Sequence, residues 1–97
     1  ETALGIVLAA EGTGRLPLLR AVAALTTGPA AILGSRAPAP GLVEGAPADL
    51  VVADRHATWT VDAVSLRSKG KNSPLLGREL PGVVRLTLAG GRVAFAG

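Results

Sequence analysis

The first twelve residues, ETALGIVLAAEG, restrict the fold of this chain more than any other segment. They predict a helix with almost no polar face, because its apolar positions are Ala3, Leu4, Ile6, Val7, Leu8 and Ala10. Gly12 and Gly14 are expected to end it. Such a helix should be buried on most sides, yet a chain of 97 residues forms only a modest core. We therefore expect it to pack against a larger surface than this chain provides.

A second helical segment is predicted over residues 15–35, RLPLLRAVAALTTGPAAILGS. Pro17 suits the first helical position, where no backbone N–H is needed. Apolar residues follow at a spacing of three to four, namely Leu18, Leu19, Val22 and Leu25. Thr27 is expected to cap a short turn that Pro29 opens and Gly34 ends.

The composition changes at Ser35. Residues 35–48, SRAPAPGLVEGAPA, read as a connector, and the division between domains is expected at 35–40. The apolar run DLVVAD, residues 49–54, predicts a strand buried on both faces. ATWTV, residues 57–61, predicts a second strand or a continuation of the first.

The C-terminal residues VVRLTLAGGRVAFAG predict a β-hairpin. Gly90 and Gly91 separate two short apolar runs, and glycine tolerates the positive φ that a two-residue hairpin turn requires. The whole is an α/β chain in which helices precede strands. This small number of elements cannot cover every sheet edge and apolar face. An incomplete fold is therefore predicted. The chain begins at Glu1 and has no methionine, so we expect a piece of a longer product.

Few residues could support catalysis or bind a metal. His56 is the sole histidine and there is no cysteine, whereas a zinc site needs three or four ligands. We expect His56 to be a solvated residue between a strand and a turn.

The aspartates each suit a capping or turn role, namely Asp49, Asp54 and Asp62. Asp62 is expected at a turn that runs to Leu66. The serines lack a histidine base in a recognisable motif. No catalytic, substrate-binding or metal-binding residue is predicted here.

The segment RSKGKNSPLLGREL, residues 67–80, is the most cationic stretch. It has no aromatic residue for base stacking, and no nucleic-acid-binding motif accompanies it, so we expect no nucleic-acid partner. Its charges should stay in water, while leucines anchor it, namely Leu75, Leu76 and Leu80. No membrane association is expected either, because the apolar stretches fall short of the roughly 20 residues that a span needs.

The segment LRSKGKNSPLLGRELPGVVRLTLAGGRVAF closely resembles the C-terminus of the dihydroorotases of the amidohydrolase superfamily. Leu75 stands where that family usually has phenylalanine. GLVEGAPADLVVADRHATWTVD resembles the preceding strands, and ETALGIVLAAEGTGRLPLLRAVAALTTGPAAILG resembles the last barrel helices. The resemblance covers essentially the whole chain in the right order.

That resemblance implies the last helices of a zinc-bearing (β/α)8 barrel and the C-terminal strands of a small composite β-domain. Residues 1–34 would be the barrel helices, 35–40 the connector, and 41–97 the β-domain contribution. The family's His-x-His pair, carboxylated lysine and aspartate do not occur here, so zinc would be bound by residues upstream of this chain. Glu1 and Thr2 would lie near the active site, but neither is assigned a contact.

The implied function is the reversible cyclisation of N-carbamoyl-L-aspartate to L-dihydroorotate in de novo pyrimidine biosynthesis, in the cytoplasm. The implied partners are the N-terminal remainder of the enzyme and the small-molecule substrate, with a homodimer or an aspartate transcarbamoylase complex as the assembly. Alternatives remain open: a hydantoinase or allantoinase, a catalytically silent subunit that scaffolds aspartate transcarbamoylase, or an independent small binding module.

Overall fold

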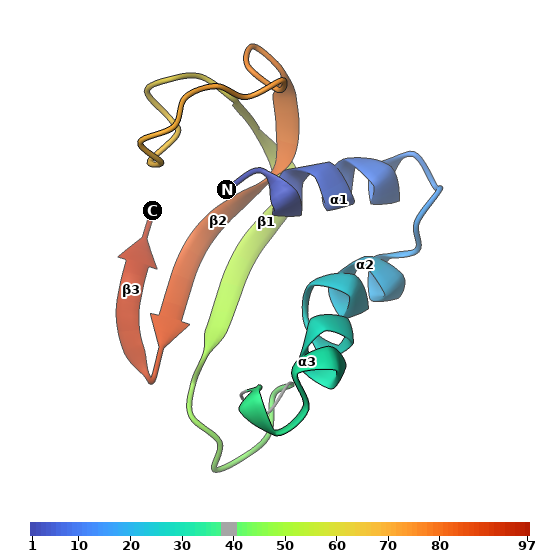
Figure 1. Ribbon diagram of the computed structural model, residues 1–97, viewed down its shortest axis with the longest axis vertical. Helices are drawn as coiled ribbons and strands as arrows, with labels where there is room; N and C mark the ends of the chain where they lie inside the picture. Colours follow the sequence, from blue (N-terminus) through green and yellow to red (C-terminus); the bar gives the residue numbers. More distant parts are fainter. Residues whose placement is uncertain (38–40) are drawn as a thin grey trace.

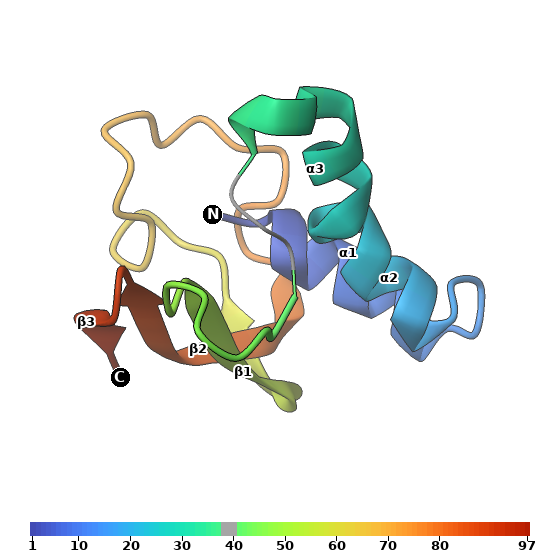
Figure 2. The same ribbon diagram turned by 90° about the horizontal axis from the view of Figure 1, so that it is seen from below.

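The computed structural model describes residues 1–37 and 41–97, and in them helices precede strands as predicted. The three strands form one antiparallel sheet in the order β1-β2-β3. The helices lie to one side of this sheet, and α1 crosses it near β2 (Figures 1 and 2). The elements are α1 (Ala3–Gly12), α2 (Leu18–Leu25), α3 (Thr27–Leu33), the 3-10 helix η1 (Gly34–Arg36), β1 (Leu50–Thr60), β2 (Glu79–Ala89) and β3 (Arg92–Ala96).

Two glycines allow α1 to approach β2 closely. A Cβ atom on Gly5 would lie 2.9 Å from the Cβ of Leu80, which real Cβ contacts do not permit. A Cβ atom on Gly82 would lie 2.6 Å from Cδ1 of Leu8, and Gly82 has a φ of +94° that side-chain-bearing residues rarely adopt. Leu8 is consequently buried against the sheet.

The described residues bury only part of α1, and the larger surface predicted to cover the rest is not provided by them. Within the described residues, only Gly5 and Leu8 of this helix are buried, and Ile6 remains 46% exposed. The physical reason is that β2 and α2, the elements that contact α1, cover only part of its circumference.

The second helical segment is divided at Thr26, and two details of its prediction need correction. Pro17 precedes the first turn of α2 with an extended ψ of 144°, so the helix begins one residue later than predicted. Thr26 has φ −130° and ψ −85°, and its Oγ1 donates a hydrogen bond to the Val22 carbonyl at 2.7 Å. Thr27 is therefore the first residue of α3 rather than its cap. Gly34, with a φ of +59°, ends α3 as predicted.

Residues 35–40 are only partly described. Ser35 and Arg36 complete η1, whereas the predicted connector's residues 38–40 lie outside the described residues.

β1 runs without interruption from Leu50 to Thr60, so the ATWTV segment continues the first predicted strand. The predicted burial of that strand on both faces is wrong, because Val51 is 56% and Val52 48% exposed. α1 packs on β2, and this leaves the first half of β1 uncovered in the part of the chain that is described.

The main cluster of buried side chains lies where β1 ends and β2 begins. Val61, Leu66 and Leu80 are buried together, and Trp59 and Leu75 pack against them. This core joins the two longest strands to the intervening loop.

The predicted hairpin between β2 and β3 is confirmed. Gly90 and Gly91 have φ values of +56° and +77°, and Ala89 pairs with Arg92 directly beside the turn. Asp49 adds a long-range contact, because its Oδ1 accepts a hydrogen bond from the Gly90 N–H at 2.6 Å.

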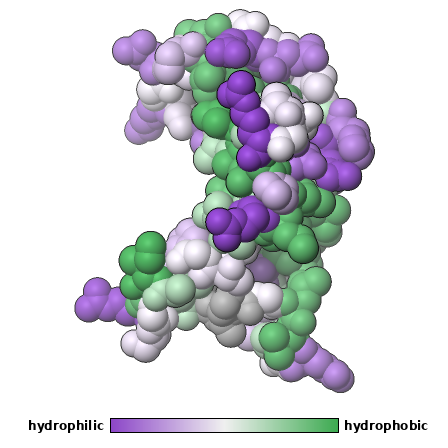
Figure 3. All heavy atoms as spheres, turned by 90° about the vertical axis from the view of Figure 1, so that its right-hand side faces the viewer, coloured by the Kyte–Doolittle hydropathy of each residue, from purple (hydrophilic) through white to green (hydrophobic). Residues whose placement is uncertain are grey.

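The expectation about apolar stretches also needs correction. The 19-residue stretch Leu18–Arg36 is long and apolar enough to cross a membrane, by length and composition. However, this stretch is not one continuous α-helix, because it is broken at Thr26, and it carries two charged residues, Arg20 and Arg36. Its apolar side chains are largely uncovered, with Leu19 83% and Ile32 88% exposed, and Figure 3 shows apolar surface on this side of the molecule.

Candidate functional site

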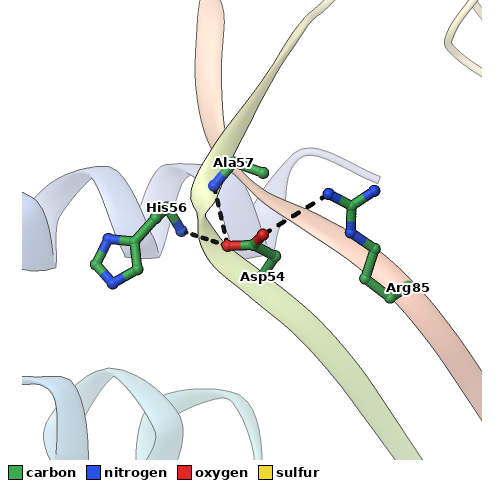
Figure 4. A network of polar contacts seen from close by, with 4 residues as sticks. All are labelled: Asp54, His56, Ala57 and Arg85. Atoms are coloured by element: carbon green, nitrogen blue, oxygen red, sulfur yellow. Dashed lines mark hydrogen bonds and ion pairs between the residues drawn. The ribbon is translucent and has the colours of Figure 1, made fainter.

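Asp54 organises an irregularity in the sheet. The pairing of β1 with β2 shifts between Asp54 and Thr58, which removes intervening backbone groups from the ladder. Oδ1 of Asp54 accepts hydrogen bonds from the N–H groups of His56 and Ala57, at 3.0 and 3.1 Å (Figure 4). These two hydrogen bonds hold the pKa of Asp54 below its usual value. Asp54 therefore accepts the local N–H groups that the prediction gave to a turn, but it does so in a bulge within β1 rather than at a turn.

The other polar contact of Asp54 is an exposed ion pair. Arg85 Nη2 lies 3.7 Å from Asp54 Oδ2, and the two side chains are 50% and 43% exposed, so water screens the attraction. The His56 imidazole points away from this carboxylate (Figure 4) and is exposed, as predicted. Its location needs correction, because His56 lies in the bulge within β1 rather than between a strand and a turn.

Asp62 caps a single turn, as predicted. Its Oδ1 accepts the N–H groups of Val64 and Ser65 at 2.9 and 2.7 Å, and the Leu66 N–H donates to the Asp62 carbonyl at 3.1 Å. The backbone and hydroxyl of Ser65 hold the pKa of Asp62 below its usual value. Asp49 is likewise engaged at the hairpin.

The described residues do not fit a zinc ion. Nowhere in residues 1–37 and 41–97 do three or more histidine, cysteine, aspartate or glutamate side chains gather to hold a metal. A zinc site requires three or four such ligands in close geometry. No catalytic step can therefore be derived from metal chemistry on this chain's own residues.

The N-terminus of α1 and the cationic loop form the contact that sequence reasoning missed. The Glu1 carboxylate accepts hydrogen bonds from the backbone N–H groups of Arg67 and Ser68, at 2.8 and 2.7 Å, and from the Ser68 hydroxyl. Together these bonds lower the pKa of Glu1 from 4.5 to about 2, and the bond from the Ser68 hydroxyl contributes most. The partners are 66 and 67 residues apart in the sequence, so no local pattern could have indicated the contact. Thr2 provides no side-chain cap to α1.

The cationic loop is held at further points. The Arg67 guanidinium lies over the Phe95 ring, 5.4 Å from its centroid. Lys71 Nζ donates a hydrogen bond to the Leu66 carbonyl. Lys69 remains exposed, in keeping with the prediction that the charges of this loop stay in water.

Two of the three predicted leucine anchors of this loop are confirmed. Leu80 is buried and Leu75 packs against the core. Leu76 lies in the same turn as Leu75, but it is 45% exposed and does not pack against the buried cluster, so the prediction that it anchors the loop is wrong.

A groove of about 540 Å³ lies between α1, the sheet and the start of the loop. Glu1 and Arg67 line it together with Trp59 and Phe95. These side chains place both charge and apolar surface in the groove, but they include no arrangement of a nucleophile with a general base.

Curated proteins that resemble this chain are dihydroorotases. The chain is 46% identical over 93 residues to a dihydroorotase of Anaeromyxobacter dehalogenans (strain 2CP-1 / ATCC BAA-258), which covers 96% of this chain and 21% of that protein. It is 45% identical over 92 residues to a dihydroorotase of Geobacter metallireducens, covering 95% and 21%. A dihydroorotase of Syntrophus aciditrophicus is 40% identical over 95 residues, covering 98% and 22%. The chain thus spans about a fifth of the length of these relatives.

The fold of the chain also matches a solved structure. A structure of D-hydantoinase superposes with a TM-score of 0.85 and 25% identity, covering 96% of this chain and 20% of that chain. The model of the Amidohydrolase family matches residues 9–95, which is most of the sequence. The helices and sheet are arranged as in a solved relative, and the family match runs along nearly the whole length. The chain therefore belongs to the amidohydrolase family.

Proposed function

We propose that this chain is the C-terminal part of a zinc-dependent dihydroorotase. The enzyme would interconvert N-carbamoyl-L-aspartate and L-dihydroorotate by reversible loss and addition of water, in de novo pyrimidine biosynthesis. The observation that carries this proposal is the 46% identity to a dihydroorotase along 96% of the chain.

In this proposal, the helices α1 to α3 belong to the end of a (β/α)8 barrel, and the three strands belong to a composite β-domain. The uncovered apolar side chains support it, because an isolated domain rarely exposes so much apolar surface. Leu19, Ile32 and Val51 are 83%, 88% and 56% exposed and lie on three different elements. The N-terminal remainder of the enzyme would cover them.

Zinc and the catalytic residues would come from that remainder, since the described residues bring together no metal-ligand cluster. The 97-residue chain alone is accordingly expected to be inactive. The complete enzyme would act in the cytoplasm on its small-molecule substrate, as a homodimer or in a complex with aspartate transcarbamoylase.

A second candidate is another cyclic amide hydrolase, namely a hydantoinase. It is favoured by the superposition on a D-hydantoinase structure over nearly the whole chain. The identity of 25% to that protein is well below the 46% to a dihydroorotase, and this difference ranks dihydroorotase first.

The test is an activity assay on the intact protein that contains this chain. Hydrolysis of dihydroorotate and of hydantoin is measured side by side, before and after treatment with a zinc chelator and after zinc is restored. Preferential turnover of dihydroorotate that the chelator abolishes and zinc restores would support the proposal. Preferential turnover of hydantoin would favour the second candidate. An absence of turnover with zinc supplied would contradict both and favour a silent scaffolding subunit.

A further inference from the structure

The Glu1 side chain makes three hydrogen bonds to a loop that is distant in the sequence. One carboxylate oxygen accepts the Arg67 N–H at 2.8 Å, and the other accepts both the N–H and the hydroxyl of Ser68. We propose that Glu1 acts as a clamp that fixes the start of the cationic loop (residues 67–80) to the start of α1. This inference goes beyond the proposed function and does not depend on it.

The geometry suits a clamp because two of the three donors are backbone groups. Backbone N–H groups cannot rotate away as a long side chain can, so holding them restricts the chain itself. Hydrogen bonds to an ionised acceptor are also shorter and stronger than those between neutral groups. Here one carboxylate binds adjacent residues through its two oxygens. This fixes the orientation of the loop backbone as well as its distance from Glu1.

Other contacts hold the same loop from different sides. Lys71 Nζ donates to the carbonyl of Leu66, the buried residue just before the loop, which ties the loop to the core cluster. The Arg67 guanidinium rests over Phe95 of β3, so the loop contacts the sheet as well as α1. Glu1 is the contact that joins this assembly to the helix, and its loss should free the loop from α1 without dissolving the core under it.

The clamp also satisfies backbone donors at the start of the loop. Adjacent backbone N–H groups that converge, with a hydroxyl beside them, form a concavity that binds anions. In this chain the Glu1 carboxylate occupies that position at Arg67 and Ser68. The backbone donors of Arg67 and Ser68 are thereby engaged within the fold, whereas the Lys69 side chain stays exposed to water.

The test is amide hydrogen exchange in the intact protein with Glu1→Gln. The glutamine retains the shape but replaces one acceptor oxygen with an NH₂ group, which cannot accept from an N–H donor. We expect exchange at Arg67 and Ser68 to accelerate about tenfold. The amides of His56 and Ala57 are the internal control, because Asp54 holds them in the same way elsewhere. The matched variant is Glu11→Gln, which loses only an exposed 3.3 Å ion pair with Arg55.

Unchanged exchange at Arg67 and Ser68 in Glu1→Gln would overturn the clamp. Equal acceleration at His56 and Ala57 would also overturn it, since the whole domain would then have loosened. If Glu1→Gln does not fold, Ser68→Ala removes only the hydroxyl donor and should accelerate exchange at Arg67 and Ser68 about two- to threefold. No local change in that variant would likewise contradict the proposal. Because the readout is not turnover, this test and the dihydroorotase assay can fail independently.

Discussion

Replacing Gly82 with alanine tests whether α1 is seated on β2 as the structure describes. The new Cβ atom would lie 2.6 Å from Cδ1 of Leu8, and the backbone φ of +94° is strained for any residue with a side chain. Backbone strain of this kind costs about 1–3 kcal/mol. Overpacking adds about 1–3 kcal/mol, reduced here because the Leu8 methyl group is the end of a flexible side chain. We expect the free energy of unfolding to fall by about 2–4 kcal/mol.

The assay is urea unfolding of the intact protein, followed by the shift of the midpoint. Gly77→Ala is the matched control, because Gly77 has a φ of +81° but no heavy atom within 4 Å of the Cβ position. It should therefore lose only the strain contribution, about 1–3 kcal/mol and less than Gly82→Ala in the same protein. The difference between the two variants isolates the contact with Leu8.

A double mutant sharpens the same test. Leu8→Ala alone should cost about 2–5 kcal/mol, because it empties a buried position. In the Gly82→Ala background it should cost about 1–2 kcal/mol less, since removing Cδ1 relieves the clash. The reasoning is refuted if Gly82→Ala is no more destabilising than Gly77→Ala, or if the two substitutions are additive.

Two further predictions concern the cationic loop and its partner. The lowered pKa of Glu1 means that its stabilising contribution is complete above pH 4.5 and is lost as the pH falls towards about 2. The difference in unfolding free energy between the unmodified protein and Glu1→Gln should therefore shrink over that pH range in acid titrations. A difference that stays constant would contradict the lowered pKa of Glu1. Replacing Lys69 and Lys71 with glutamine should alter solubility more than kcat/KM for dihydroorotate. A large loss of kcat/KM would show that these charges serve the reaction.

Features set by neighbouring residues could be predicted from the sequence. Gly90 and Gly91 adopt the positive φ values that a two-residue hairpin needs, and Asp54 and Asp62 accept N–H groups two and three residues ahead. The helical nature of residues 3–12 followed from a run of apolar residues that ends in glycine. The resemblance to dihydroorotases also came from sequence, because its motifs are contiguous.

Exposure could not be predicted in the same way. Val51 and Val52 read as a strand buried on both faces, and residues 3–12 as a helix buried on most sides, but both are substantially uncovered. An apolar pattern indicates which surface of an element is suited to burial. Whether that surface is buried depends on whether another element packs against it. In the described chain β2 and α2 cover only part of α1, while the first half of β1 remains open.

The sequence by itself thus determined the hairpin turn at Gly90 and Gly91, the local N–H acceptor roles of Asp54 and Asp62, and the family. Only the tertiary structure decided that Glu1 holds Arg67 and Ser68 and that Gly82 admits Leu8. The physical reason is the range of the interactions. Propensities, caps and turns depend on residues a few positions apart. Contacts across tens of residues exist only after the chain has packed, and no short-range pattern encodes them.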